Sequence, residues 1–186
     1  MSPETATPIV LLTGPPGGGK STVGRLVAEA FDRSVHLEAD VVRESTVSGF
    51  VQPGPEAFAG EGLRQFQLQR EIVTEWAKRT ARDGYVTVID DAPIPPAGHF
   101  EQQYAELLAL PMIHPVILRA DGDVVRQRIR DRGGEFDGVL VGLVDAALGF
   151  LDDLDDSVWH TVDSTDLSIE ATAAAIVAHV RSASAG

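Results

Sequence analysis

The feature that most constrains this chain is the segment 14–21, which reads GPPGGGKS. An apolar run at 9–13 precedes it and an amphipathic run at 22–31 follows it, as a β-strand and an α-helix would. Glycines allow the backbone to fold around an anion with its N–H groups pointing inward, and the positive end of the following helix adds to the attraction. The segment therefore predicts a phosphate-binding loop for a nucleoside triphosphate.

Two side chains of this loop have specific expected roles. We expect Lys20 to bridge the β- and γ-phosphates and the Ser21 hydroxyl to ligate Mg²⁺. Lys20 and Lys78 are the only lysines of the chain, so a lysine at this position is not compositional background. The alternative is a Gly/Pro-rich turn that matches by chance, and the flanking strand and helix argue against it.

Composition limits the class of protein and its partners. The 186 residues predict a single domain over 1–186, and zero cysteines exclude disulfides and thiolate chemistry. Residues 1–8 lack the features of a signal peptide, and no apolar stretch is as long as a membrane span, so we expect a cytoplasmic protein without a membrane partner. The net charge of −13 argues against a nucleic-acid partner and favours a neutral or cationic small molecule, unless local arginines reverse the field.

Strand-like and helix-like segments alternate along the whole chain. Such alternation predicts an α/β fold, with a parallel sheet between two layers of helices. Ligands of such sheets lie beyond the carboxyl ends of the strands. We expect strands at 9–13, 35–39, 85–90, 115–119 and 158–162, and helices near 20–31, 56–82, 98–109, 121–131, 139–153 and 168–182.

Asp40 follows the second expected strand and would face the same crevice as the phosphate loop. Transfer of a phosphoryl group to a hydroxyl needs a base that orients and deprotonates the hydroxyl, and Asp40 is the candidate. The alternative is a helix N-cap, a position that aspartate favours.

Asp90 and Asp91 follow the third expected strand, and an apolar run before an acid is typical of a carboxylate that serves Mg²⁺. We favour Asp90 for the metal, because it would directly end the strand, and Asp91 for the acceptor. The acids at 152–156 are expected to be a solvated helix end rather than a calcium site. The five histidines show no metal-ligand spacing, so structural or surface roles are expected for them.

Five arginines lie within residues 119–132, and glycines follow them. Such a segment can close over a nucleotide and bring guanidinium groups to the transferred phosphoryl group, so we expect a short arginine-rich lid at about 128–140. The alternative is a solvated basic helix that pairs with nearby acids.

These motifs together resemble the small P-loop kinases of the nucleoside monophosphate kinase superfamily, and among them the chloramphenicol phosphotransferase-like and tunicamycin-resistance-like ATP-binding proteins. The resemblance implies a three-layer P-loop NTPase fold with a five-stranded parallel sheet in the order 2-3-1-4-5. It implies that ATP and Mg²⁺ are cofactors, that Arg128 stacks on adenine, that Arg132 is a catalytic lid arginine and that Asp40 and Lys20 are catalytic. The residues implied to bind the nucleotide are Gly17, Gly18, Gly19, Lys20, Ser21, Thr22, Arg128, Ser164 and Thr165.

The expected activity is transfer of the γ-phosphoryl group to a hydroxyl of a small molecule, including antibiotics, by a monomer or homodimer. We expect the acceptor to contact a helical region at about 41–82. A nucleoside monophosphate kinase is an alternative, since residues 40–43 fit its D-x-x-R pattern, but the arginine of its D-G-F-P-R motif is missing after Asp90. A regulatory P-loop ATPase is a third possibility. The candidate substrate residues are Arg43, Phe50, Phe58, Arg64 and Asp91.

Overall fold

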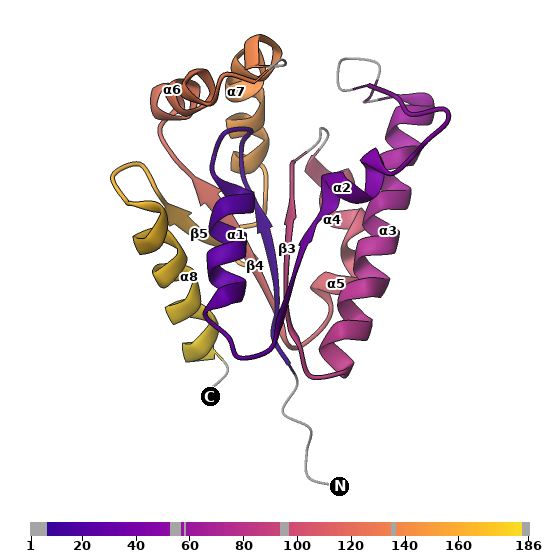
Figure 1. The fold of residues 1–186 in the computed structure, drawn as a ribbon, viewed down its shortest axis with the longest axis vertical. Helices are drawn as coiled ribbons and strands as arrows, with labels where there is room; N and C mark the ends of the chain where they lie inside the picture. The colour runs from indigo at the N-terminus through magenta and orange to yellow at the C-terminus, as the bar shows by residue number, and fades with distance from the viewer. Residues whose placement is uncertain (1–6, 53–56, 58, 94–96, 135–136, 184–186) are drawn as a thin grey trace, which may run out of the picture.

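The computed structural model describes residues 7–52, 57, 59–93, 97–134 and 137–183. Its centre is a five-stranded sheet whose neighbouring strands are all parallel, in the order β2-β3-β1-β4-β5 (Figure 1). This order confirms the expected P-loop kinase topology. The strands are β1 (Ile9–Thr13), β2 (Ser34–Glu38), β3 (Val86–Asp91), β4 (Ile113–Arg119) and β5 (His160–Asp163).

Helices cover both faces of the sheet. On one face, α1 and α8 contact each other, and the second face carries α3, α4, α5 and α7 (Figure 1). The helices are α1 (Lys20–Glu29), α2 (Ala39–Glu44), α3 (Gly60–Arg82), α4 (Ala97–Gln103), α5 (Ala105–Leu108), α6 (Gly122–Arg132), α7 (Asp137–Asp152) and α8 (Ile169–Ala183). None of the described helices is long and apolar enough to cross a membrane.

The central strand β1 explains the three layers. All five of its residues are buried, and successive side chains point to opposite faces of a sheet. Val10 and Leu12 pack with α1 and α8, whereas Ile9 and Leu11 pack against the helices of the second face. A strand that is apolar on both faces is therefore covered from both sides.

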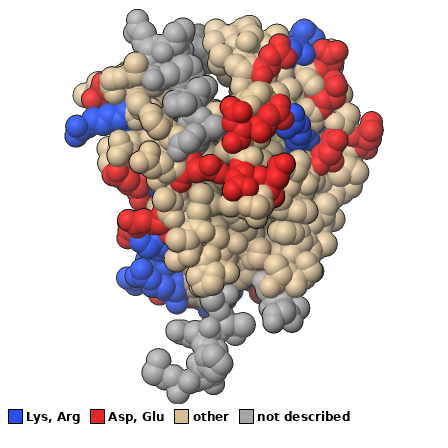
Figure 2. Space-filling view, turned by 180° about the vertical axis from the view of Figure 1, so that it is seen from behind, with Lys and Arg blue, Asp and Glu red and all other residues tan. Residues whose placement is uncertain are grey.

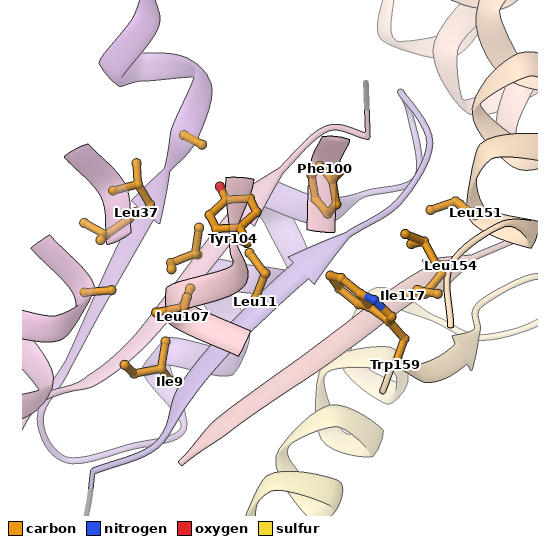
Figure 3. Packing of buried hydrophobic residues seen from close by; sticks show 14 of the residues in the cluster. Ile9, Leu11, Leu37, Phe100, Tyr104, Leu107, Ile117, Leu151, Leu154 and Trp159 are labelled. Atoms are coloured by element: carbon orange, nitrogen blue, oxygen red, sulfur yellow. The ribbon is translucent and has the colours of Figure 1, made fainter. Parts of the chain in front are cut away.

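The core of the second face is rich in aromatic side chains. Phe100 lies in edge-to-face contact with Tyr104 and Phe150, at centroid distances of 5.3 Å and 5.9 Å. Figure 3 shows Tyr104 and Leu107 near Leu11, with Trp159 beside them over β4. These contacts fix α4, α5 and α7 against the sheet.

Most of the expected elements form within a few residues of their predicted bounds. The exception is the helix expected at 98–109, which is divided into α4 and α5 at Tyr104. The helix expected from 56 begins at Gly60, and a short helix, α2, follows β2 directly. On the face turned away from the view of Figure 1, acidic side chains outnumber basic ones (Figure 2), in keeping with the net charge of −13.

Candidate active site

Several predicted site residues meet beyond the carboxyl ends of β1, β2 and β3. The phosphate loop follows β1, α2 follows β2, and Asp90 and Asp91 end β3. Because the three strands are parallel neighbours, these segments meet at one edge of the sheet. In Figure 1 the loop lies between α2 and α3 on one side and α6 and α7 on the other.

The backbone of the phosphate loop requires glycine at two positions. Gly17 and Gly19 have φ angles of 73° and 86°, a region that other residues rarely adopt. A Cβ atom at Gly17 would also lie 2.3 Å from Cγ1 of Ile129 on α6. Gly19 is the N-cap of α1 and has no side chain to cap the helix, so the first N–H groups of α1 are left for an anionic ligand.

Lys20 lies across this loop. Its Nζ atom donates hydrogen bonds to the carbonyl oxygens of Gly14 and Pro15, at 3.0 Å and 3.1 Å. Burial lowers the pKa of Lys20, and the carboxylates of Asp90 and Asp40 oppose this shift. A desolvated ammonium group next to open backbone donors is suited to hold a phosphate.

Ser21 and Asp90 form a pair of oxygen ligands beside the loop. The Ser21 hydroxyl donates a hydrogen bond of 3.1 Å to Oδ1 of Asp90. Hydroxyl and carboxylate oxygens are the ligands that Mg²⁺ prefers, usually together with water and substrate phosphates. These residues therefore fit a magnesium ion next to the phosphate loop, and the metal role of both stays a prediction.

Asp91, which follows Asp90 in β3, faces the opposite side of the sheet from Asp90. Both residues belong to β3, so the expectation that Asp90 ends the strand is wrong by one residue. Oδ2 of Asp91 accepts hydrogen bonds from Nε of Arg70 at 2.7 Å and from the hydroxyl of Tyr104 at 3.0 Å, and Oδ1 accepts one from Gln69 at 3.1 Å. Asp91 thus anchors α3 and the α4–α5 segment to the sheet, and its proposed contact with an acceptor stays a prediction.

Arg70 is a residue that sequence reasoning missed. Its side chain is fully buried, and the Asp91 carboxylate raises its pKa although burial alone would lower it. A signal was present, because position 70 falls on the same helical stripe as the buried Phe66, Val73 and Ala77. A charged residue on a core-facing stripe needs a buried partner, and the sequence did not indicate which acid that is.

Asp40 lies in the first turn of α2, not at the end of β2, which ends at Glu38. The N-cap of α2 is Glu38, so the alternative role of Asp40 as a cap is wrong. Its side chain reaches solvent, yet the surrounding protein and the charge of Asp91 raise the pKa of the Asp40 carboxyl, whereas Lys20 lowers it. A carboxylate near Lys20 with a raised pKa has the properties of a general base.

Arg43 lies one turn further along α2. Its guanidinium group lies over the rings of Phe66 and Phe50, at 4.3 Å and 5.0 Å from their centroids, and Nη1 donates to the Val51 carbonyl at 3.2 Å. The side chain is buried, and within the described part of the chain Nε has no hydrogen-bond partner and no acid forms an ion pair with this arginine. Arg43 is therefore a buried cation with unused donor capacity near Asp40.

The other candidate substrate residues differ in placement. Phe50 lies between two residues whose backbone is hydrogen-bonded to Gln65 of α3. Nε2 of Gln65 donates to the carbonyl oxygen of Gly49 at 2.7 Å, and Oε1 accepts from the backbone N–H of Val51 at 3.0 Å. Arg64 lies on an exposed part of α3, and Phe58 lies outside the described residues. The structure thus brings Arg43 and Phe50 together and leaves Arg64 apart from them.

The arginine segment forms α6. This helix contacts the segment after β5, and both were predicted to belong to the nucleotide site. Nη2 of Arg128 donates a hydrogen bond of 2.8 Å to the carbonyl oxygen of Ser164. Thr165 donates to Asp163 at 2.6 Å and accepts from the Asp121 backbone at 3.0 Å, which ties the segment after β5 to the start of α6. Arg128 and Ser164 are therefore direct neighbours, and their roles in binding adenine stay predictions.

Arg132 is the last residue of α6 and lies near the phosphate loop. Its positive charge contributes to the lowered pKa of Lys20. Nη2 donates to Oδ1 of Asp137 at 2.6 Å, and this hydrogen bond lowers the pKa of Asp137. Part of the expected lid, residues 135–136, lies outside the described residues.

A groove elsewhere on the surface does not belong to this site. A groove of about 610 Å³ between α3 and the α4–α5 segment is lined by residues such as Gln67, Glu71 and Gln102, and its described lining contains neither the phosphate loop nor Asp40. Among the residues that the structure describes, no group of three or more His, Cys, Asp or Glu side chains could hold a metal ion. The acids at 152–156 lie at the last residue of α7 and just after it, and their role as a solvated helix end stays a prediction.

This site and fold define a P-loop nucleotide-binding protein, and the comparison with known families gives its class. A family model described as "AAA domain" matches residues 10–138, which is more than half of the chain. The chain belongs to this family.

Curated relatives narrow the class to the P-loop kinases. The chain is similar to shikimate kinase from Corynebacterium diphtheriae, with 32% identity over 133 residues that cover 55% of this chain and 76% of that enzyme. A second match is a UPF0200 protein from Aeropyrum pernix, 52% identical over 48 residues, which is 26% of each chain. The chain thus belongs to the class of P-loop kinases that includes shikimate kinase.

The fold matches solved structures over almost its full length. The tunicamycin resistance protein of Deinococcus radiodurans is similar with a TM-score of 0.67 and 18% identity, over 94% of this chain and 96% of that one. At this identity the likeness shows a common fold.

Proposed function

We propose that this protein transfers the γ-phosphoryl group of ATP to a hydroxyl group of a small molecule. The observation that carries the proposal is the convergence of Lys20, the Ser21–Asp90 pair and Asp40 at one edge of the sheet. These groups supply the three parts that phosphoryl transfer needs, a phosphate cradle, metal ligands and a base. We also propose that the enzyme is cytoplasmic and acts as a monomer or homodimer, and the net charge of −13 supports the absence of a nucleic-acid partner.

Each of these residues would have a separate role in the reaction. Mg²⁺, held by Ser21 and Asp90, would neutralise phosphate charge, and the backbone of the loop with Lys20 would hold the phosphates. Asp40 would accept the proton of the acceptor hydroxyl. At the same time the oxygen of that hydroxyl would bond to the γ-phosphorus, and the bond between the γ-phosphorus and ADP would break. Arg132 would reach the transferred group and stabilise the charge that develops there.

The acceptor that we favour is a neutral or cationic hydroxylated natural product, such as an antibiotic that phosphorylation inactivates. The net charge of −13 and the aromatic rings of Phe50 and Phe66 beside Arg43 support this proposal. The name of the D. radiodurans relative, a tunicamycin resistance protein, also supports it.

A second candidate acceptor carries a carboxylate or a phosphate, as a nucleoside monophosphate does. Arg43 supports it, because this buried guanidinium has an unused donor and no ion-pair partner among the described residues. A buried cation is costly without a negative partner, and an anionic acceptor would supply one.

An ADP-release screen over antibiotics, shikimate, gluconate and nucleoside monophosphates tests the proposal. We expect one acceptor class to stimulate ADP release, with a product heavier by one phosphoryl group. Asp40→Asn should lower the turnover of that acceptor by about a hundredfold or more. In the wild type, the acid limb of kcat/KM should lie above the usual aspartate pKa, because the pKa of Asp40 is raised.

Arg43→Met separates the two acceptor classes. An anionic acceptor would lose much of its kcat/KM in this variant, whereas a neutral or cationic acceptor would be affected far less. A wild-type protein that phosphorylates none of these compounds, or an Asp40→Asn variant with normal turnover, contradicts the proposal.

A further inference from the structure

His36 is a histidine of β2 that lies on the same face of the sheet as Asp90. In the β2–β3 pairing, His36 is opposite Val88 and Glu38 is opposite Asp90. Because alternate residues of a strand share a face, His36 and Asp90 both point toward the layer of α1. The sequence analysis predicts only a structural or surface role for this histidine.

The imidazole of His36 contacts the carboxylate that we assign to the metal. Its Nε2 atom is 2.6 Å from Oδ2 of Asp90, while Oδ1 of the same carboxylate accepts the hydrogen bond from Ser21. The side chains of His36 and Asp90 are only 13% and 7% exposed. Each oxygen of Asp90 is thus held by a different element, β2 on one side and α1 on the other.

A glycine in α1 makes room for this contact. A Cβ atom at Gly24 would lie 2.8 Å from Nε2 of His36, closer than such atoms approach in folded proteins. Glycine in a helix interior costs about 0.5–1 kcal/mol relative to alanine. Gly24 is a buried residue in the interior of α1, so this loss of helix stability falls at the residue that contacts the imidazole.

We propose that His36 is a positioning residue for the metal site. It donates the Nε2 hydrogen to Oδ2 of Asp90 and thereby keeps Oδ1 turned toward Ser21 and the phosphate loop. The pair of metal ligands is then in place before a nucleotide binds. This inference rests on the proposed function for the role of Ser21 and Asp90, and it requires no particular acceptor.

Partners that orient a metal ligand contribute about 10–100-fold to metal affinity. The test compares His36→Leu and His36→Asn, which remove the donor at the Nε2 position, with His36→Gln, whose longer amide can return a donor to it. His99→Leu, a change of an exposed histidine on α4, is the matched control. Thermal unfolding identifies which variants fold.

The measurement is the affinity for Mn²⁺ in the presence of ADP, followed by electron paramagnetic resonance, together with the affinity for ADP in EDTA by calorimetry. We expect His36→Leu and His36→Asn to bind Mn²⁺ about 10–100-fold more weakly. Their affinity for ADP in EDTA should stay within about twofold of the wild type, since the phosphate loop is unchanged. His36→Gln should recover most of the Mn²⁺ affinity, and His99→Leu should keep all of it.

Wild-type Mn²⁺ affinity in the folded Leu or Asn variant would overturn the proposal. So would a Gln variant as weak as the Asn variant, or a wild type that binds ADP without binding Mn²⁺. These assays use no acceptor and no turnover. A protein that shows the expected metal pattern but transfers no phosphoryl group therefore contradicts the proposed function alone.

Discussion

At the residue scale, the two adjacent acids at the end of β3 illustrate how one strand serves two purposes. Asp90 faces α1 and meets Ser21 and His36, whereas Asp91 faces α3 and meets Arg70 and Tyr104. The alternation of side chains along a strand explains this division. The sequence favoured Asp90 for the metal but did not identify the partners of either carboxylate, because these partners are 13 to 69 residues away in the chain.

The ion pair between Arg70 and Asp91 leads to a prediction about stability. Both side chains are at most 1% exposed, so removing one charge leaves the other buried and unpaired. We predict that Arg70→Met lowers the free energy of unfolding by about 3–5 kcal/mol. Arg79→Met, which removes an exposed pair with Asp83, should cost less than about 1 kcal/mol. Chemical denaturation measures both, and equal small losses would refute the structural role of Arg70.

At the element scale, the helix expected at 121–131 forms as α6, within one residue of its predicted bounds. The glycines after the arginines and the N-cap at Asp121 bound the helix, and Asp121 accepts from the Asp123 backbone at 2.9 Å. The division between α4 and α5 could not be predicted, because it depends on tertiary contacts. Tyr104 interrupts the helix where its hydroxyl reaches Asp91 and its ring packs on Phe100.

We predict that Arg132 acts mainly in the transition state. Arg132→Ala should lower kcat by about a hundredfold or more while raising the KM for ATP much less, since charge builds on the phosphoryl group only during transfer. Arg130→Ala, on the same helix, is the control. Steady-state kinetics distinguishes the two, and an effect on stability without an effect on kcat would mean that α6 is only a structural helix.

Three histidines from β4, β5 and α8 form a cluster that predicts a pH dependence of stability. His179 stacks on His160 at 3.8 Å and meets His114 edge-on at 5.8 Å. Burial lowers the pKa of His114, and burial with the charges of its two neighbours lowers the pKa of His179. Below a pH of about 6.5 the unfolded chain therefore binds more protons than the folded chain, and the free energy of unfolding falls as pH decreases.

The comparison of His179→Phe with the wild type measures this contribution. Phenylalanine keeps an aromatic ring against His160 but does not titrate, so the loss of stability between pH 7.5 and pH 5.5 should be smaller in the variant. His99→Phe, at an exposed position, should leave the loss unchanged. The prediction fails if both variants show the pH dependence of the wild type.

At the scale of the whole molecule, the alternation of elements was sufficient to predict the parallel sheet and its two helical layers, whereas the strand order was predicted from the resemblance to the small P-loop kinases. An apolar β1 needs cover on both faces, and a loop of this composition needs a strand before it and a helix after it. The arrangement of the candidate acceptor-binding residues was much less predictable. Arg43 lies over the rings of Phe50 and Phe66, and no local sequence pattern determines this stacking.

Calorimetric titration of the wild type and Lys20→Ala tests most directly whether this molecule is built around a site for Mg-ATP. Lys20 lies over the phosphate loop and would form charge-assisted hydrogen bonds to the phosphates, each contributing about 1.5–3 kcal/mol. We predict that the wild type binds Mg-ATP and that Lys20→Ala, with an unchanged melting temperature, binds it at least about tenfold more weakly. Equal affinity in both proteins, or no binding by the wild type, would contradict the assignment of this site to Mg-ATP.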